Sequence, residues 1–260
     1  MNIVKIWLFT TCAIVGLSNY VYSSHRCKAS ILIKSDTIIL YPGSKSINYK
    51  KIKPFKTEYD FNRVQKGVEK SYGTYTDSVQ YKTLNGKRLL LRISTFPAKQ
   101  LIDSAYYDAN TLNALSNKES SSAEKWSLNF SKSNVTGIHT IKDSTVNINE
   151  EINSIFFDGY LNDFILKYVD LNQNATYKVP IYAYGIHGLT WIIYSVNGTR
   201  QFIKKNGERV DAAIVKVSLA NMKFNNTFYI NKENKETIEM AFYNPANEIY
   251  FLKKNKAYTF

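Results

Sequence analysis

Histidine, cysteine and proline are scarce in this chain of 260 residues, which contains three, two and five of them. Two cysteines can form at most one disulfide bond, so a small domain held together by several bridges is excluded. Only His25, His139 and His187 could serve as imidazole bases or metal ligands. Acidic residues are also few: the chain has 21 Asp and Glu and 34 Lys and Arg, so the net charge is +13.

The motifs of common enzyme classes are missing as well. The sequence has no Gly-x-Ser-x-Gly nucleophile turn and no glycine-rich phosphate loop. Its His, Cys, Asp and Glu residues form no group with the spacing of a zinc or calcium site. We therefore expect no catalytic residue, no cofactor and no metal, and we predict that the protein is not an enzyme.

The first 23 residues are typical of an export signal. Lys5 supplies the positive start, Ile6–Leu17 is an uncharged apolar run, and Val21–Ser23 fits a cleavage site. The alternative is a retained membrane anchor, but this run is shorter than the roughly 20 residues that span a bilayer. We expect residues 1–23 to be removed and the protein to be exported, to the periplasm or the outer membrane, with secretion as the alternative.

The segment after this signal, residues 24–54, has no clear period and is predicted to be an N-terminal tail or linker with a short strand. Cys12 lies inside the signal, in a poor context for lipid attachment. Removal of the signal therefore leaves Cys27 as the one thiol, without an intramolecular partner.

From Phe55 onward the chain is dominated by strand patterns. Leu89, Leu91 and Ile93 alternate with Leu90, Arg92 and Ser94, which is typical of an antiparallel sheet with one buried face. The richness in aromatic residues, 20 Tyr and 14 Phe, suits half-buried strands. We expect residues 55–260 to form a single β-rich domain. Its second half contains predicted strands at Tyr177–Tyr184, Leu189–Val196, Thr199–Ile203, Ala212–Leu219, Phe224–Ile230, Thr237–Tyr243 and Glu248–Leu252.

Three Asn-Gly pairs predict turns between strands, at Asn85-Gly86, Asn197-Gly198 and Asn206-Gly207. At the first pair two registers are possible. A three-residue loop, Leu84–Gly86, places Tyr81 opposite Leu89 and gathers the apolar groups on one face. A two-residue loop would place Tyr81 opposite Leu90. The hydrophobic pattern favours the three-residue loop.

One helix is predicted among the strands, over about residues 158–168. Its apolar stripe consists of Leu161, Phe164, Ile165 and Tyr168, at positions i, i+3, i+4 and i+7, and Asp158 suits its N-cap. We expect this amphipathic helix to pack in or against a curved sheet and its stripe to face a ligand.

The order of several segments resembles a family of bacterial cell-envelope proteins that carry domain of unknown function 3108, common in Bacteroidota. The segments are Phe61–Gly67, Leu84–Arg88, Tyr106–Leu112, Phe156–Asp158 and Leu171–Pro180. The resemblance implies a strongly curved antiparallel sheet or incomplete β-barrel, export and no established activity or catalytic residue. Such a sheet is similar in outline to periplasmic lipoprotein carriers of the LolA type, an analogy of fold alone.

Two functions follow as hypotheses. The first is a binding or carrier module for a lipid or another hydrophobic ligand. The second is a structural or protein-interaction component of the envelope with no small-molecule ligand. The basic charge could serve an anionic envelope surface or be an ordinary solvated surface. Nucleic acid is not expected as a partner, because Lys50-Lys51, Lys204-Lys205 and Lys253-Lys254 lie on separate segments.

Overall fold

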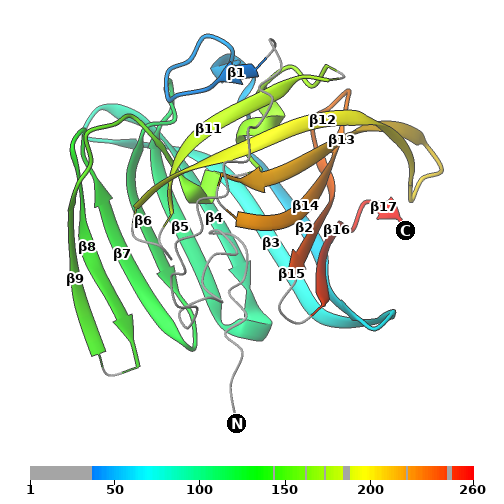
Figure 1. Ribbon diagram of the computed structural model, residues 1–260, viewed down its shortest axis with the longest axis horizontal. Coiled ribbons are helices and arrows are strands. Elements are labelled where there is room, and N and C mark those ends of the chain that lie inside the picture. The colour runs from blue at the N-terminus through cyan, green and yellow to red at the C-terminus, as the bar shows by residue number, and fades with distance from the viewer. Residues whose placement is uncertain are drawn as a thin grey trace.

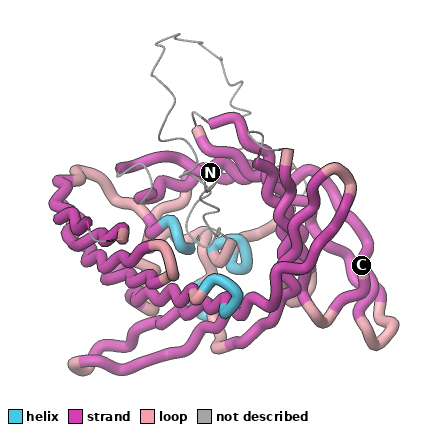
Figure 2. Tube along the Cα trace, turned by 90° about the horizontal axis from the view of Figure 1, so that it is seen from below, coloured by secondary structure: helices cyan, strands magenta, loops and turns pink. Residues whose placement is uncertain are grey.

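A single sheet of 17 strands forms almost the whole of the computed structural model (Figure 1). The structure describes residues 37–142, 144–161, 163–172, 174–183, 188–220, 222–244 and 248–260. The predicted export signal, both cysteines, His25 and His187 lie outside these residues. The sheet bends around a central space that holds short helical turns (Figure 2).

The strands in chain order are β1 (Thr37–Ile39), β2 (Phe55–Gln65), β3 (Val68–Leu84), β4 (Lys87–Phe96), β5 (Leu101–Asp108), β6 (Ala114–Ser120), β7 (Glu124–Phe130), β8 (Asn134–Ile141), β9 (Ser144–Glu151), β10 (Phe157–Asp158), β11 (Thr176–Ala183), β12 (Gly188–Lys204), β13 (Arg209–Leu219), β14 (Met222–Asn231), β15 (Thr237–Asn244), β16 (Ile249–Asn255) and β17 (Tyr258–Thr259). Four short 3-10 turns complete the fold, η1 (Tyr49–Lys51), η2 (Pro97–Lys99), η3 (Gly159–Leu161) and η4 (Ile165–Tyr168).

Neighbouring strands are antiparallel almost throughout. The exceptions among the described strands are β1 and β10, which both pair with β11 in parallel. Consecutive hairpins build two wings, β2 to β9 and β11 to β16, and the pairing of β16 with β2 joins them. The predicted fold class, a mainly β protein with a strongly curved antiparallel sheet, is therefore confirmed.

Strand β5 shows why the sequence forms this sheet. Leu101, Asp103, Ala105 and Tyr107 are buried, and the residues between them are more exposed, so the side chains alternate between a concave inner face and an outer face. Asp103 occupies one of the inner positions although it is acidic. The inner face therefore carries buried polar groups as well as apolar ones.

The register of the first Asn-Gly hairpin differs from the prediction. Tyr81 pairs with Leu90 and Leu84 with Lys87, so the loop consists of two residues, Asn85 and Gly86, both with positive φ. The prediction assumed that Leu90 lies on a wet face. In the structure four consecutive residues of β4 are buried, Leu89 to Arg92, so both faces of the strand are covered and the hydrophobic pattern cannot select a register.

The second Asn-Gly pair is not a hairpin. Strand β12 runs from Gly188 to Lys204 without interruption, and its register with β13 shifts between Val196 and Thr199. Asn197 and Gly198 form this irregularity, with Gly198 at φ +145°. The two strands predicted on either side are therefore one bent strand. Gly207, at φ +86°, lies in the turn between β12 and β13, as predicted.

The prediction of an amphipathic helix over about residues 158–168 is also wrong. The segment consists of two short 3-10 turns, η3 and η4. The prediction required one apolar side and one wet side, whereas Leu161, Phe164, Ile165 and Leu166 are all fully buried. Polar anchors also hold the segment, since Asp158 accepts a hydrogen bond from the Tyr160 N–H at 3.1 Å. Because the core surrounds this segment on all sides, packing contacts rather than an amphipathic helical pattern determine its backbone conformation.

Candidate functional site

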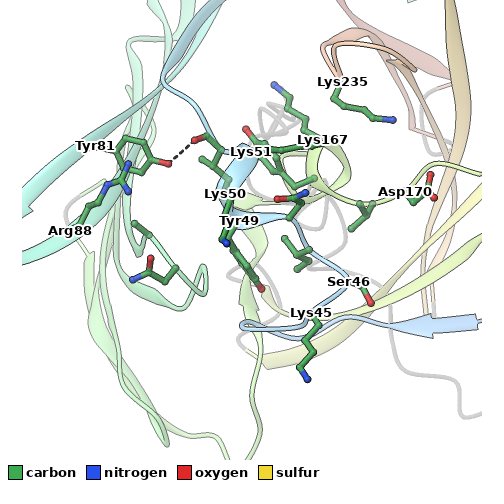
Figure 3. A pocket seen from close by; sticks show the side chains of 17 residues that line it. Lys45, Ser46, Tyr49, Lys50, Lys51, Tyr81, Arg88, Lys167, Asp170 and Lys235 are labelled. Atoms are coloured by element: carbon green, nitrogen blue, oxygen red, sulfur yellow. Dashed lines mark hydrogen bonds between the residues drawn. The ribbon is translucent and has the colours of Figure 1, made fainter.

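A cavity of about 890 Å³ lies where several turns at one end of the sheet meet the N-terminal segment (Figure 3). We call it the basic pocket. Its lining comprises residues 45–52 of the N-terminal segment, Tyr81 and Arg88 of the β3–β4 hairpin, Ala109 and Asn110 after β5, residues 167–170 around the end of η4, and Lys235 between β14 and β15.

The N-terminal segment is held in place as one wall of this pocket. Ile47 and Ile52 are buried and anchor it to the core. The N–H of Asn48 donates to the carbonyl oxygen of Tyr168 at 2.8 Å. The hydroxyl of Tyr81 donates to the carbonyl oxygen of Ile52 at 2.7 Å, the bond drawn in Figure 3. The wall is therefore fixed by buried side chains and by main-chain bonds to both sides of the pocket.

Positive charge dominates the lining. Five exposed or partly exposed cationic side chains line the pocket together with one carboxylate, Asp170; the five are Lys45, Lys50, Lys51, Arg88 and Lys235. A sixth cation of the lining, Lys167, is buried, and its ammonium nitrogen lies 4.0 Å from the centre of the Phe55 ring, where Asp163 and Asp77 of the interior act on it. Among the described residues none of these six forms an ion pair. Burial lowers the pKa of Lys235, the nearby charges of Lys51 and Lys232 lower it further, and Asp170 opposes them. The pocket therefore gathers cations that repel one another.

Three tyrosines lie among these cations. Tyr49, Tyr81 and Tyr168 are each partly buried and line the pocket. The guanidinium carbon of Arg88 lies 3.7 Å from the centre of the Tyr81 ring, which holds the cation in a defined position. The hydroxyl of Tyr49 accepts a hydrogen bond from the Gly43 N–H at 2.8 Å. The lining therefore combines positive charge with aromatic surface of fixed orientation.

Charges of both signs meet in the interior, inside the curve of the sheet. Arg92 on β4 is 2% exposed and forms a bidentate pair with Asp77 on β3, at 3.0 and 2.8 Å. The same guanidinium donates to Asp163 at 2.8 Å and to the carbonyl oxygen of Tyr160 at 2.6 Å. Arg92 thereby ties the segment between η3 and η4 to the sheet. We call Asp77, Arg92 and Asp163 the buried triad.

Two buried lysines lie near the triad. Burial by itself raises the pKa of Asp163, but the charges of Arg92, Lys253 and Lys167 outweigh it and hold that pKa well below its usual range. Burial lowers the pKa of Lys253 to about 8, although Asp163 and Asp77 oppose the change. Lys167 is 8% exposed and also lines the basic pocket, so it connects the pocket with the interior charges.

The predicted ligand-facing stripe is divided between the core and the pocket. Leu161, Phe164 and Ile165 are fully buried and belong to the main hydrophobic core. Tyr168 is partly exposed and lines the basic pocket. Contact of these four residues with a ligand stays a prediction. The structure brings Tyr168 together with cations from the N-terminal segment, which the sequence pattern did not associate with it.

Sequence reasoning missed the pocket and the triad for different reasons. Lys50-Lys51 and Lys235 lie far apart in the sequence and meet only because the two wings of the sheet are joined. Arg92 was assigned to a wet face of β4. In the observed register Arg92 pairs with Val79, two residues from Asp77, so the two charged side chains lie on the same face of neighbouring strands. Their proximity could be predicted from the sequence only with the correct register of the hairpin.

His139 is packed between neighbouring side chains of the sheet. Its ring stacks on Trp126 with centroids 3.5 Å apart, and its Nε2 lies 2.9 Å from Glu124 Oε2. Within the ranges that the structure describes, no group of three His, Cys, Asp or Glu residues could hold a metal ion. The same ranges contain no helix that is long and apolar enough to cross a membrane.

Comparisons with solved structures give distant matches. One is a crystal structure of a β-barrel-like protein of domain of unknown function DUF1849 from Brucella abortus, 11% identical, with a TM-score of 0.44 over 78% of this chain and 95% of that chain. Another is a provisionally named lipoprotein from Parabacteroides distasonis ATCC 8503, 11% identical, with a TM-score of 0.30 over 80% and 96% of the two chains.

No curated protein has a sequence similar enough to match this chain. A family profile does match, over residues 58–252, which is most of the chain and includes strands β3 to β15 completely. The matched region begins after the N-terminal wall of the basic pocket and contains the buried triad. The chain therefore belongs to the family of proteins of unknown function DUF3108.

Proposed function

We propose that this protein is an exported, non-enzymatic binding protein that holds an anionic ligand in the basic pocket. The observation that carries the proposal is the lining itself, in which five exposed or partly exposed cationic side chains and one carboxylate surround a cavity of about 890 Å³. Ligand sites in proteins have volumes of roughly 300–1,000 Å³. A cavity of this size and charge suits a small anion or an anionic head group.

The unpaired cations need a reason, since folding alone does not favour them. Burial of Lys235 lowers its pKa, and the charges of Lys51 and Lys232 act in the same direction, although the Asp170 carboxylate opposes them more strongly than Lys51 does. An anion would remove this repulsion and form charge-assisted hydrogen bonds with both ammonium groups. Protonated lysines attract anions but are poor bases, which supports binding rather than catalysis.

The proposed ligand is more specific than the lipid or other hydrophobic ligand expected from the sequence. A purely hydrophobic ligand placed against Leu161, Phe164 and Ile165 would have to displace fully buried side chains of the core. A lipid whose anionic head group enters the basic pocket would not, because Tyr168 and the cations are already exposed to the cavity. We therefore propose an anionic ligand, and a lipid only through its head group.

Export is part of the proposal and rests on residues 1–23. The expected location is the cell envelope, in the periplasm or at the outer membrane, with secretion as the alternative. Fractionation of cells that express the full-length chain tests this. Recovery of a shortened protein in the envelope fraction supports export, whereas recovery of the full-length chain in the cytoplasm contradicts it.

Binding can be tested by isothermal titration calorimetry with inorganic pyrophosphate as the probe, at low ionic strength. The variant Lys50→Gln/Lys51→Gln/Lys235→Gln removes three charges from the pocket. We expect it to bind pyrophosphate at least about tenfold more weakly, because each charge-assisted bond contributes roughly 1.5–3 kcal/mol and tenfold is 1.4 kcal/mol.

A matched control carries the same loss of charge elsewhere. Lys56, Lys125 and Lys205 are exposed, lie outside the basic pocket and can be changed to Gln together. The control should bind pyrophosphate within about twofold of the unchanged protein, since long-range attraction is screened at more than about one Debye length. Equal weakening in both variants would show attraction to net charge and contradict a site in the pocket.

A second candidate function is a protein-interaction component of the envelope, and one observation favours it. On the outer face of the sheet, Ile102 and Ile138 are 55% and 47% exposed and line a shallow groove of about 450 Å³. Sedimentation velocity of the Ile102→Ser/Ile138→Ser variant tests whether this face holds copies together. A change from a dimer to a monomer supports it, and monomers in both proteins contradict self-association.

A further inference from the structure

We propose that strand β9 pairs with β9 of a second copy of this chain, in antiparallel orientation about a two-fold axis at Asn147. The surface is an open edge of the sheet, separate from the basic pocket and from the groove at Ile102 and Ile138. Strand β9 ends the strand order, and among the described strands only β8 pairs with it (Figure 1). The inference does not depend on the proposed anion site.

The two ends of the strand order differ in length. At one end, β1 and β10 have three and two residues, which is too short to hold a long partner strand. Strand β9 has eight residues, and its register with β8 continues from Ser144 to Glu151 without a shift. Proteins usually protect exposed edge strands with proline, lysine, a bulge or short length. Strand β9 has none of these, so its edge can accept another extended strand.

The hydrogen bonds show which backbone groups of β9 point outward. The N–H of Ile152, directly after β9, donates to the carbonyl oxygen of Ser133 at 2.6 Å, and these two residues continue the register of β9 with β8. In an antiparallel ladder such bonded positions alternate along the strand. Even-numbered residues of β9 therefore bond to β8, and the N–H and C=O groups of Thr145, Asn147 and Asn149 point away from it.

The side chains of β9 are arranged symmetrically about Asn147. Val146 and Ile148 on either side of it are apolar, and Thr145 and Asn149 beyond them are polar and exposed. Val146 is 55% exposed and lies on the same face as the buried Ile148, because side chains alternate along a strand. A second β9 centred on Asn147 therefore places each Val146 opposite the Ile148 of the other copy and covers it.

Charge favours the antiparallel orientation. Glu150 and Glu151 give one end of β9 two negative charges. A parallel pairing would put these carboxylates side by side, and like charges directly opposite each other destabilise a strand pair. The antiparallel pairing moves them to the start of the other strand, where the sequence Lys142-Asp143 has no net charge. The partner that fits this edge is therefore a second copy of the chain, bound in the same way on both sides.

Cysteine cross-linking tests the pairing. The variant Cys27→Ser removes the thiol that remains after the export signal, and Asn147→Cys is added to it. Opposite residues that share backbone hydrogen bonds have Cα atoms about 5.5 Å apart, which a disulfide can span. We expect mild oxidation to link the Asn147→Cys protein into dimers. Thr145→Cys and Asn149→Cys should each stay unlinked, because the same residue of the other copy lies roughly 13 Å further along the strand.

A mixture of two variants tests the register. When the Thr145→Cys and Asn149→Cys proteins are mixed before oxidation, a linked dimer of the two should form, because these residues lie opposite each other in the proposed pairing. Any other pattern overturns the inference. Equal linking of all three variants alone would show random collision, and no linking of any would show that the two edges do not meet.

Sedimentation velocity provides a test without a cross-link. Asn147→Pro removes the outward N–H of this residue and leaves the bonds of β9 to β8 in place, as proline does in edge strands. We expect self-association to weaken at least about tenfold, because each copy loses a hydrogen bond. Ile102→Ser, on β5, should leave self-association unchanged.

The outcomes separate this inference from the other proposals. Monomers of the unchanged protein at every concentration overturn it, as does a dimer that is lost in Ile102→Ser and kept in Asn147→Pro. Circular dichroism checks that each variant is folded. Asn147→Pro should bind pyrophosphate as the unchanged protein does, so the anion site stands or falls on its own titration.

Discussion

The interior and the basic pocket use positive charge in opposite ways. In the buried triad, Arg92 is surrounded by two carboxylates and a carbonyl oxygen, and each hydrogen bond that its guanidinium donates to them is 3.0 Å or shorter. In the pocket, five exposed or partly exposed cations are accompanied by one carboxylate. Paired charge in the interior belongs to the architecture, whereas unpaired charge beside solvent is available to a ligand.

The difference reflects the cost of charge in each place. A charge in a buried site is strongly destabilising unless it is paired and hydrogen bonded, so Arg92 can exist only with its partners. A lysine at the edge of a cavity keeps water around its ammonium group and tolerates the lack of a partner at a small cost. Substitutions in the two regions should therefore affect stability and binding in opposite proportions.

Loss of the buried cation should have the largest effect on stability. Arg92→Met leaves Asp77 and Asp163 without their partner in the interior. We expect the free energy of unfolding to fall by about 3–5 kcal/mol, as when one member of a buried pair is removed. Urea unfolding followed by circular dichroism measures it. A loss below about 1 kcal/mol would mean that the triad is hydrated.

Removal of all three charges should be less harmful than removal of one. The variant Asp77→Leu/Arg92→Met/Asp163→Leu replaces the triad with apolar side chains and leaves no buried carboxylate of the triad without its cation. The buried Lys167 and Lys253 lose the two carboxylates that act on them, and because burial already lowers the pKa of both, they can release their protons instead of staying charged. We expect it to recover at least about 2 kcal/mol relative to Arg92→Met in the same urea experiment. A triple variant less stable than the single one would show that the hydrogen bond from the Ser94 hydroxyl to Asp77, which the triple variant removes, supports the fold.

Lys253 should make stability rise with pH. Because its pKa in the folded protein is lowered to about 8 from 10.5, the folded chain releases this proton first as the pH rises. Unfolding then takes up a proton, and the free energy of unfolding increases between about pH 8 and 10.5. Lys253→Met should reduce this slope, measured by urea unfolding at several pH values.

The neighbouring lysine provides the control for that experiment. Lys254 is the next residue of β16 and pairs with Glu69 at 2.7 Å near the surface. Lys254→Met should leave the slope above pH 8 unchanged. If Lys253→Met and the unchanged protein show the same slope, Lys253 is not buried as a charge, and its contribution to the interior would have to be reconsidered.

The smallest effect on stability is expected in the pocket. Lys50→Gln/Lys51→Gln/Lys235→Gln removes charges that lack an ion-pair partner in the described chain, so the free energy of unfolding should change by less than about 1 kcal/mol, and upward. The same urea measurement tests it. A loss as large as that of Arg92→Met would show that these lysines support the fold and are not reserved for a ligand.

Much of the fold could be predicted because the sequence pattern of a strand is local. Alternating residues such as those of β5, and the Asn206-Gly207 turn, carry their own signal. The register at Asn85-Gly86 could not be predicted, since β4 is covered on both faces and its apolar residues do not distinguish them. The same error placed Arg92 on the wet side and hid the triad.

The prediction of a helix around η3 and η4 was wrong for a related reason. The stripe of Leu161, Phe164 and Ile165 is real, but Leu166 on the other side is equally buried. A sequence cannot show that a short apolar segment will be enclosed completely, because that depends on strands far away in the chain. The basic pocket depends even more on distant parts, since Lys51 and Lys235 meet only in the folded sheet.

The position of a bound anion in a crystal shows whether the basic pocket is an anion site. Crystals of the mature protein grown with tungstate, a heavy analogue of phosphate, would reveal it by anomalous difference density. We expect a tungstate peak in the basic pocket, within hydrogen-bond distance of Arg88 or of Lys51 and Lys235. Peaks only on lysines outside the pocket, such as Lys56 or Lys205, would contradict it.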